Sequence, residues 1–221
     1  TVITLKKRTP LKERTLPAYT RGEEIMNMVT HIVGGGVGVI IFVACMVVSI
    51  MNGNPWAIAS SVIYGFSMVA LYTVSSVYHG LKLCMGKRVM QVIDHCTIYM
   101  LIAGTYTPIL LVGVRPDNPG VAWGVFAAQW GIAALAATLT AIDLKKYKVL
   151  SMVCYIIMGW MVVLTLKPVI KAMTYDGFLW LLAGGIAYTI GAILYGIGSK
   201  VRYFHSVFHI FVNIGSLLQA V

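Results

Sequence analysis

The chain has few charged residues and lacks the motifs of the common soluble enzyme classes. Asp, Glu, Lys and Arg make up only 11% of the 221 residues, whereas 59% are hydrophobic. A soluble core cannot hold that much apolar sequence, and apolar runs of about 18 or more residues recur along the chain. Phosphate-binding loops, nucleotide fingerprints and a nucleophile elbow are absent by inspection. The composition therefore predicts a helical membrane protein with several spans.

Cysteine is also scarce, and its spacing excludes two kinds of site. The four cysteines occur singly, without a C-x-x-C pair. Neither a disulfide framework nor a thiolate zinc site is predicted from this pattern. Burial preference instead indicates small apolar side chains that fill space between helices.

The first 20 residues lack the apolar segment of a signal peptide. They are polar and basic, and Pro10 and Pro17 interrupt them. We expect residues 1–20 to form a cytoplasmic basic tail.

The apolar runs predict one domain, residues 21–221, folded as an all-α integral membrane bundle of seven transmembrane helices. Thr20-Arg21-Gly22-Glu23 has the form of a capping box, so the first helix should begin near residue 21. Pro108 predicts a kink in the third helix. Since a bilayer requires roughly 20 residues per span, we expect helices at about 21–51, 56–82, 89–113, 119–142, 148–167, 175–198 and 203–221.

The basic residues predict the orientation of these spans. A net charge of +10 suggests nucleic acid, but the basic clusters lie between apolar runs without a binding fold, so we expect no nucleic-acid partner. With the N-terminus in the cytoplasm, 14 of the 17 basic residues fall on the cytoplasmic side, and only Arg115, Lys167 and Lys171 fall outside. This predicts a multi-pass protein of the inner (plasma) membrane with its C-terminus outside, opposite to a G-protein-coupled receptor.

Three histidines form a candidate metal site. His205 and His209 are four residues apart in the last predicted span, so both lie on one face of a helix, one turn apart. His79 ends the second predicted span at a similar depth near the cytoplasmic side. Ionisable groups inside a membrane are costly and therefore indicate function. Three imidazoles with an open fourth position are typical of a catalytic Zn²⁺ site.

Further polar residues gather at the same depth. Asp94 could act as a general base toward water at the metal, and Ser75 could orient that water or donate to a developing oxyanion. Glu24 and Asn27, in the first turns of the first helix, are expected to contact and orient a metal ligand or to stabilise the beginning of that helix.

Two other intramembrane histidines, His31 and His95, are expected to join helices through hydrogen bonds. That is at least as common a role for a lone intramembrane histidine as metal binding.

The chain resembles a known family through four motifs in order, from about Gly22 to its end. They are Glu24-x-x-Asn27, Ser75-x-x-x-His79, the run Asp94-His95-Cys96-Thr97-Ile98-Tyr99-Met100-Leu101-Ile102-Ala103-Gly104-Thr105-Tyr106-Thr107-Pro108, and His205-x-x-x-His209. Together they resemble the signature of the haemolysin III proteins, the bacterial branch of the progestin and adiponectin receptor (PAQR) family.

That resemblance implies roles for the same residues. His79, His205 and His209 match the family's zinc ligands, Ser75 and Asp94 match residues around the zinc-bound water, and Glu24 and Asn27 match its first-helix motif. The family is similar in turn to alkaline ceramidases, which hydrolyse a lipid amide.

Two classes of function stay open from the sequence. One is a zinc-dependent hydrolase of a lipid amide or ester bond, with a membrane lipid as its substrate. The other is a non-catalytic protein of membrane homeostasis, signalling or haemolytic pore formation in which zinc is structural.

Overall fold

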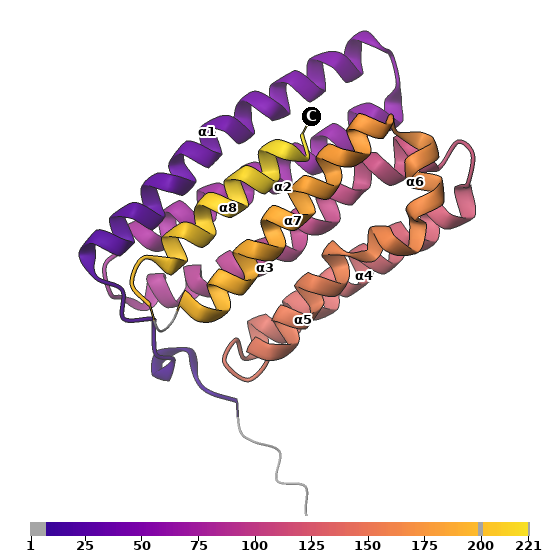
Figure 1. Cartoon of the computed structure of the whole chain (residues 1–221). Helices are drawn as coiled ribbons and strands as arrows, with labels where there is room; N and C mark the ends of the chain where they lie inside the picture. Colours follow the sequence, from indigo (N-terminus) through magenta and orange to yellow (C-terminus); the bar gives the residue numbers. More distant parts are fainter. Residues whose placement is uncertain (1–7, 199–200, 221) are drawn as a thin grey trace, which may run out of the picture.

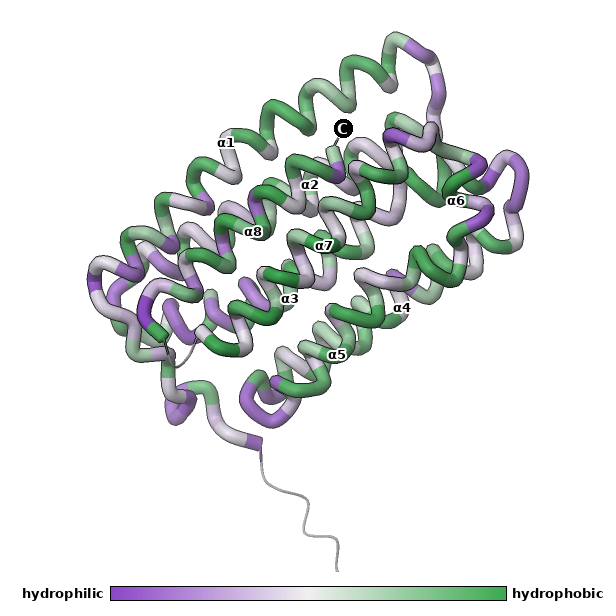
Figure 2. Tube along the Cα trace, viewed as in Figure 1, coloured by the Kyte–Doolittle hydropathy of each residue, from purple (hydrophilic) through white to green (hydrophobic). Residues whose placement is uncertain are grey.

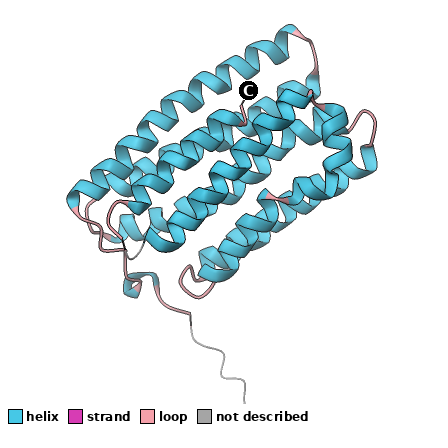
Figure 3. Cartoon of the chain, viewed as in Figure 1, coloured by secondary structure: helices cyan, strands magenta, loops and turns pink. Residues whose placement is uncertain are grey.

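The structure, a computed structural model, describes residues 8–198 and 201–220, and these residues form helices and loops without any strand (Figures 1 and 3). Residues 1–7 of the expected tail, the pair 199–200 and Val221 of the last predicted span lie outside the described residues. The α-helices are α1 (Arg21–Met51), α2 (Pro55–Gly80), α3 (Met85–Pro108), α4 (Pro119–Ile142), α5 (Lys148–Gly159), α6 (Leu166–Ala172), α7 (Tyr175–Gly198) and α8 (Phe204–Leu218).

The beginnings of α1 and α2 follow from local sequence. Thr20 and Glu23 make the predicted capping box, in which each side chain accepts a hydrogen bond from the other residue's backbone N–H. At the other end of α1, Gly53 adopts φ 61°, in the left-handed region that glycine favours. Asn54 then caps α2 by accepting hydrogen bonds from two backbone N–H groups, and Pro55 occupies the first turn. The predicted capping box is thus confirmed.

Apolar helices of membrane-spanning length dominate the described chain. Six helical stretches are long and apolar enough to cross a membrane, and the apolar helix Phe204–Leu218 is shorter. Apolar side chains on α1 point away from the bundle; Ile40, for example, is 69% exposed. Figure 2 shows hydrophobic residues along the helices and hydrophilic residues mainly at their ends. Exposed apolar surface on this scale fits lipid contact, and the chain is a multi-pass membrane protein.

Two of the predicted spans are irregular. The third continues past Pro108 as a π-helical segment, Ile109–Val114, where a kink was predicted. The fifth, predicted as one helix over 148–167, breaks after Gly159 into the 3₁₀ segment Met161–Thr165 and then α6. Irregular backbone inside a membrane requires hydrogen-bond partners from the surrounding protein.

Side chains supply partners at the break after α5. The Tyr106 hydroxyl donates to the Gly159 carbonyl and accepts from the Val162 N–H, both at 2.8 Å. Gln129, which is fully buried on α4, donates to the Met158 carbonyl at 2.8 Å. The break is therefore stabilised by residues of two neighbouring helices, a pattern that helical periodicity does not reveal.

One end of the bundle collects the polar residues. There α1 and α8 begin, α2 ends and α3 begins; we call this the site end (Figure 1). Helix α1 packs on α2 and α8, while α8 also packs on α7. Tyr64, Met68, Leu71, Tyr72, Leu101 and Val212 form a core cluster that joins α2, α3 and α8. This packing brings the start of α8 beside the end of α2.

The described part of the N-terminal segment packs against the site end instead of extending away from it. Buried Arg14 donates to the Ile142 carbonyl at 2.7 Å, and the Thr9 N–H donates to the Asp143 carboxylate at 3.1 Å. Burial alone would raise the pKa of Asp143, but the donors Thr9 and Lys146 and the Arg14 charge hold that pKa below its ordinary value of 3.8. Asp143 thus fastens residues 9–14 to the loop after α4.

Candidate metal centre

The three predicted histidines come together at the site end. One ring nitrogen from each of His79, His205 and His209 lies within 4.8 Å of the other two. His205 Nε2 and His209 Nε2 are 3.1 Å apart, and all three side chains are buried. Ligand nitrogens of a tetrahedral zinc ion, with bonds of about 2.0–2.1 Å, are about 3.3 Å apart. The cluster could therefore hold a metal ion: one nitrogen pair is near this spacing, and the nitrogen of His79 lies within 4.8 Å of both.

Contacts at Nδ1 orient the rings of His79 and His209. His79 Nδ1 lies 2.7 Å from Glu24 Oε2, and His209 Nδ1 lies 3.1 Å from the Asn27 carbonyl oxygen. These acceptors assign the ring proton to Nδ1 and leave a lone pair on each Nε2. His79 Nε2 is buried and has no hydrogen-bond partner among the described residues. An unpaired buried nitrogen is costly, so this atom fits a metal ligand.

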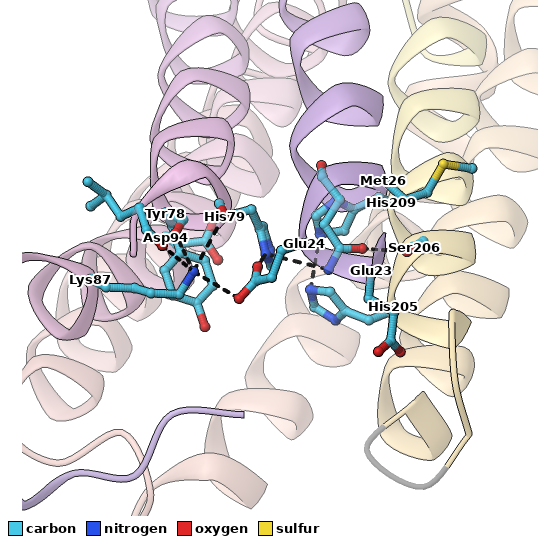
Figure 4. A network of polar contacts seen from close by, with 12 residues as sticks. Glu23, Glu24, Met26, Tyr78, His79, Lys87, Asp94, His205, Ser206 and His209 are labelled. Atoms are coloured by element: carbon cyan, nitrogen blue, oxygen red, sulfur yellow. Dashed lines mark hydrogen bonds and ion pairs between the residues drawn. The ribbon is translucent and has the colours of Figure 1, made fainter. Parts of the chain in front are cut away.

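Helix α1 supplies the supporting residues. Glu24 and Asn27 are three residues apart and therefore face the same neighbours, the end of α2 and the start of α8. The fully buried Asn27 accepts a hydrogen bond from Ser206 Oγ at 2.6 Å through its side-chain oxygen. Figure 4 shows Glu24 beside His79, with His205 and His209 projecting from α8. Glu24 and Asn27 thus contact His79 and His209 from α1.

His31 lies beside the histidine cluster and stacks on one of its rings. Its ring stacks on that of His209, with centroids 3.6 Å apart and an interplanar angle of 8°. Neither His31 nitrogen has a hydrogen-bond partner in the described chain, unlike the prediction of a helix-joining hydrogen bond. The contact of His31 with α8 is therefore ring stacking and not a hydrogen bond.

His95, by contrast, joins helices through hydrogen bonds as predicted. Its Nδ1 lies 2.8 Å from the Gln91 carbonyl oxygen, and its Nε2 lies 3.1 Å from the Tyr195 hydroxyl of α7. Both nitrogens are thereby occupied, and His95 is no part of the histidine cluster.

A cavity of about 190 Å³ opens beside the histidine cluster. Ser75, Asp94, His205 and His209 are among its polar lining residues, and Ser75 Oγ is buried without a partner among the described residues. The Asp94 side chain is 13% exposed. Most of the remaining lining is aliphatic or aromatic and comes from α3, α5, α7 and α8, including Ile102, Tyr106, Leu181 and Phe208. The structure thus gathers the predicted catalytic residues at a cavity with largely apolar walls.

The N-terminal segment lies over the histidines. The Tyr19 ring stacks on His205 with centroids 5.0 Å apart and lies 5.9 Å from the His79 ring. Burial raises the pKa of the Tyr19 phenol, so the side chain stays neutral at physiological pH. Sequence reasoning did not single out Tyr19, since a tyrosine just before a helix gives no sign of what it will cover.

Two more residues of the site were not predicted. Ser206 lies between the paired histidines, and the 3.6-residue period places it beside them, which could have marked it. Lys87 is 2% exposed and forms an ion pair with Glu24 at 2.8 Å, although its loop position indicated only a topological charge. No spacing signal would have found it, because its partner is 63 residues away in the sequence.

Known proteins match almost the whole described chain. A family profile described as "Haemolysin-III related" matches residues 19–220. The Hemolysin-3 of Bacillus cereus is 35% identical over 201 residues, which cover 89% of this chain and 88% of that protein. A Hemolysin-3 homolog of Bacillus subtilis is 35% identical over 202 residues, covering 90% and 91%. The human monocyte to macrophage differentiation factor is 26% identical over 170 residues, covering 73% and 68%.

Proposed function

The chain belongs to the haemolysin III/PAQR family, and on that premise we propose that it is a zinc-dependent membrane hydrolase of a lipid amide or ester bond. One observation carries the proposal: His79, whose buried Nε2 has no partner among the described residues, lies against two further imidazoles beside a largely apolar cavity that Ser75 and Asp94 line. By the distribution of basic residues, this centre would lie in the cytoplasmic leaflet of the plasma membrane.

His79, His205 and His209 would hold the metal. Their nitrogen donors suit Zn²⁺, and three protein ligands leave one position open, as in catalytic zinc sites. Bound zinc supplies Lewis-acid chemistry, because it polarises a carbonyl group and lowers the pKa of water. Glu24 and the Asn27 carbonyl would keep two of the imidazoles oriented.

Asp94 and Ser75 would perform the proton transfer and the charge stabilisation. The Asp94 carboxylate would accept a proton from the attacking water as the new C–O bond forms. Asp94 would then return that proton to the leaving nitrogen or oxygen as the scissile C–N or C–O bond breaks. The Ser75 hydroxyl, which lines the cavity together with Asp94, would donate to the developing oxyanion.

The cavity walls indicate the class of substrate. Aliphatic and aromatic side chains such as Ile102, Leu181 and Phe208 would exclude water and pack against an acyl chain. The polar lining would then meet the amide or ester group. A lipid could present such a bond from within the bilayer.

The metal is tested by elemental analysis of protein purified without a chelator. We expect about one zinc per chain in the wild type and none in the His205→Ala/His209→Ala variant. His95→Gln is the matched control, because His95 lies outside the cluster and should leave the metal content unchanged. A wild type free of metal would remove the basis for the centre.

Catalysis is tested with lipid amides and esters in detergent or liposomes. Asp94→Asn should retain zinc while lowering turnover by about 100-fold or more, as expected for loss of a general base. Zinc-loaded protein that turns over no lipid would instead support a structural zinc that joins α2 to α8. Because two relatives are named hemolysins, dye leakage from liposomes should be recorded as well; leakage would favour the pore alternative.

A further inference from the structure

Lys87 is a lysine buried at the site end with an unusually full set of partners. It lies in the first turn of α3, and its residue exposure is 2%. Its ammonium donates to the carbonyl oxygens of Tyr78 at 3.0 Å and Leu81 at 2.9 Å, and a longer contact of 3.4 Å reaches the His79 carbonyl oxygen. A fourth partner is Glu24 Oε1 at 2.8 Å. Burying an ammonium is expensive, so this arrangement requires an explanation beyond surface charge.

The three carbonyls locate Lys87 at the end of the helix that carries a candidate ligand. The last carbonyls of an α-helix have no partner within the helix, and α2 ends at Gly80. Lys87 binds the carbonyls of Tyr78 and His79 in that last turn, together with that of Leu81 just beyond it. Its positive charge is also favourable at a helix C-terminus. Lys87 therefore holds the backbone of the turn from which His79 projects.

The fourth partner reaches the same histidine from the other side. Glu24 bridges the two residues, with Oε1 on Lys87 and Oε2 at 2.7 Å from His79 Nδ1 (Figure 4). The ion pair orients the carboxylate that accepts the hydrogen bond from His79 Nδ1. Lys87 is thus connected to His79 along two routes, one through the main chain and one through Glu24.

We propose that Lys87 is a positioning residue of the metal centre, whose ammonium holds the end of α2 and Glu24 so that His79 presents Nε2 to the ion. This role depends on the proposed metal binding and is independent of lipid hydrolysis. Outer partners of a metal-bound histidine fix its orientation, and their loss commonly lowers metal affinity about 10- to 100-fold.

Charge repulsion alone predicts that loss of Lys87 changes the metal affinity in the opposite direction, which makes the inference testable. A positive charge near a metal site repels the cation, so removing it should tighten binding if charge dominates. If positioning dominates, Lys87→Met should weaken binding, because Glu24 and the end of α2 lose their shared partner. The direction of the change separates the two effects.

The experiment measures zinc dissociation constants of full-length variants by competition with a chromophoric chelator. Lys87→Met should bind about 10- to 100-fold more weakly than wild type, and Lys87→Arg, which keeps the charge and donors, should recover part of that loss. Lys82→Met removes a charge from the same loop at an exposed position and should bind as wild type does. Because Lys87 and Glu24 act on one ligand, the double variant Lys87→Met/Glu24→Gln should lose less affinity than two independent losses would give.

A second readout distinguishes positioning from general loss of stability. Cobalt(II) in place of zinc gives a visible absorption spectrum that depends on ligand geometry, and the spectrum of Lys87→Met should differ from that of Lys82→Met. Unchanged or tighter zinc binding by Lys87→Met, or an unchanged cobalt spectrum, would overturn the role. If Lys87→Met does not fold, Lys87→Arg decides, since its spectrum and affinity should lie between wild type and a Glu24→Gln variant. Loss of lipid turnover without any change in metal affinity would count against positioning while leaving the hydrolase proposal intact.

Discussion

Substitution of Gly34 by alanine tests how closely α1 packs against α2 and α8, because tight packing and helix propensity change the stability in opposite directions. A Cβ built on Gly34 would lie 2.7 Å from Tyr72 Cε1 and would also contact Asn213 Oδ1. Neither neighbour is free to withdraw. Tyr72 donates to Ser216 Oγ at 2.7 Å, and Asn213 Nδ2 donates to the Thr30 carbonyl at 2.8 Å. The methyl group must therefore push α1 away from α2 and α8.

The expected magnitude is the balance of two opposing effects. Overpacking a tight contact costs about 1–3 kcal/mol. Replacing glycine by alanine inside a helix returns up to about 1 kcal/mol. Because both neighbours are held by hydrogen bonds, the overpacking cost should be about 2–3 kcal/mol, so Gly34→Ala should destabilise the protein by about 1–2 kcal/mol. Gly36→Ala is the matched control, because its added methyl group would meet no neighbouring atom within 4 Å and only the favourable effect remains.

Heating in detergent followed by size-exclusion chromatography measures the apparent Tm of each variant. For a chain of this size, about 1–2 kcal/mol corresponds to a decrease of roughly 2–8 °C for Gly34→Ala. Gly36→Ala should match the wild type or exceed it by a few degrees. Equal behaviour of the two variants, or a more stable Gly34→Ala, would refute the close approach of α1 to Tyr72.

Two further outcomes test other parts of the fold. Tyr106→Phe removes the hydroxyl that bonds the Gly159 carbonyl and the Val162 N–H, so the apparent stability should fall by about 1–3 kcal/mol. Tyr175→Phe, at a position 70% exposed, should have no effect. Equal stability of the two variants would contradict the hydrogen bonds at the break after α5. Asp143→Asn should lower the Tm at neutral pH. Because the folded pKa of Asp143 lies below 3.8, this difference should persist down to about pH 5 and vanish as the pH falls through and below 3.8; a difference that grows on acidification would exclude the proposed bonds of its carboxylate.

Much of this protein follows from local sequence. Long apolar runs require helices in a membrane, since only internal hydrogen bonding satisfies a backbone in lipid. The capping box at Thr20 needs only residues three positions apart, and the helical period alone places His205 and His209 on one face. Matching depths then associated His79 with that pair, and the structure places the three rings together. The approach of His79 to that pair was predictable because span boundaries are visible as charge and turn residues.

Other features depend on which helices become neighbours, and nothing local specifies that. Asn27 meets Ser206 and Glu24 meets His79 across 179 and 55 positions of sequence. From the sequence, Lys87 is an ordinary charged residue of a loop. It is buried only because the end of α2 and the start of α1 pack against it. The break after Gly159 is stable only because Tyr106 and Gln129 reach it from α3 and α4. A polar group's partner inside a bundle is set by packing, so periodicity and depth indicate where such groups lie but not what each one binds.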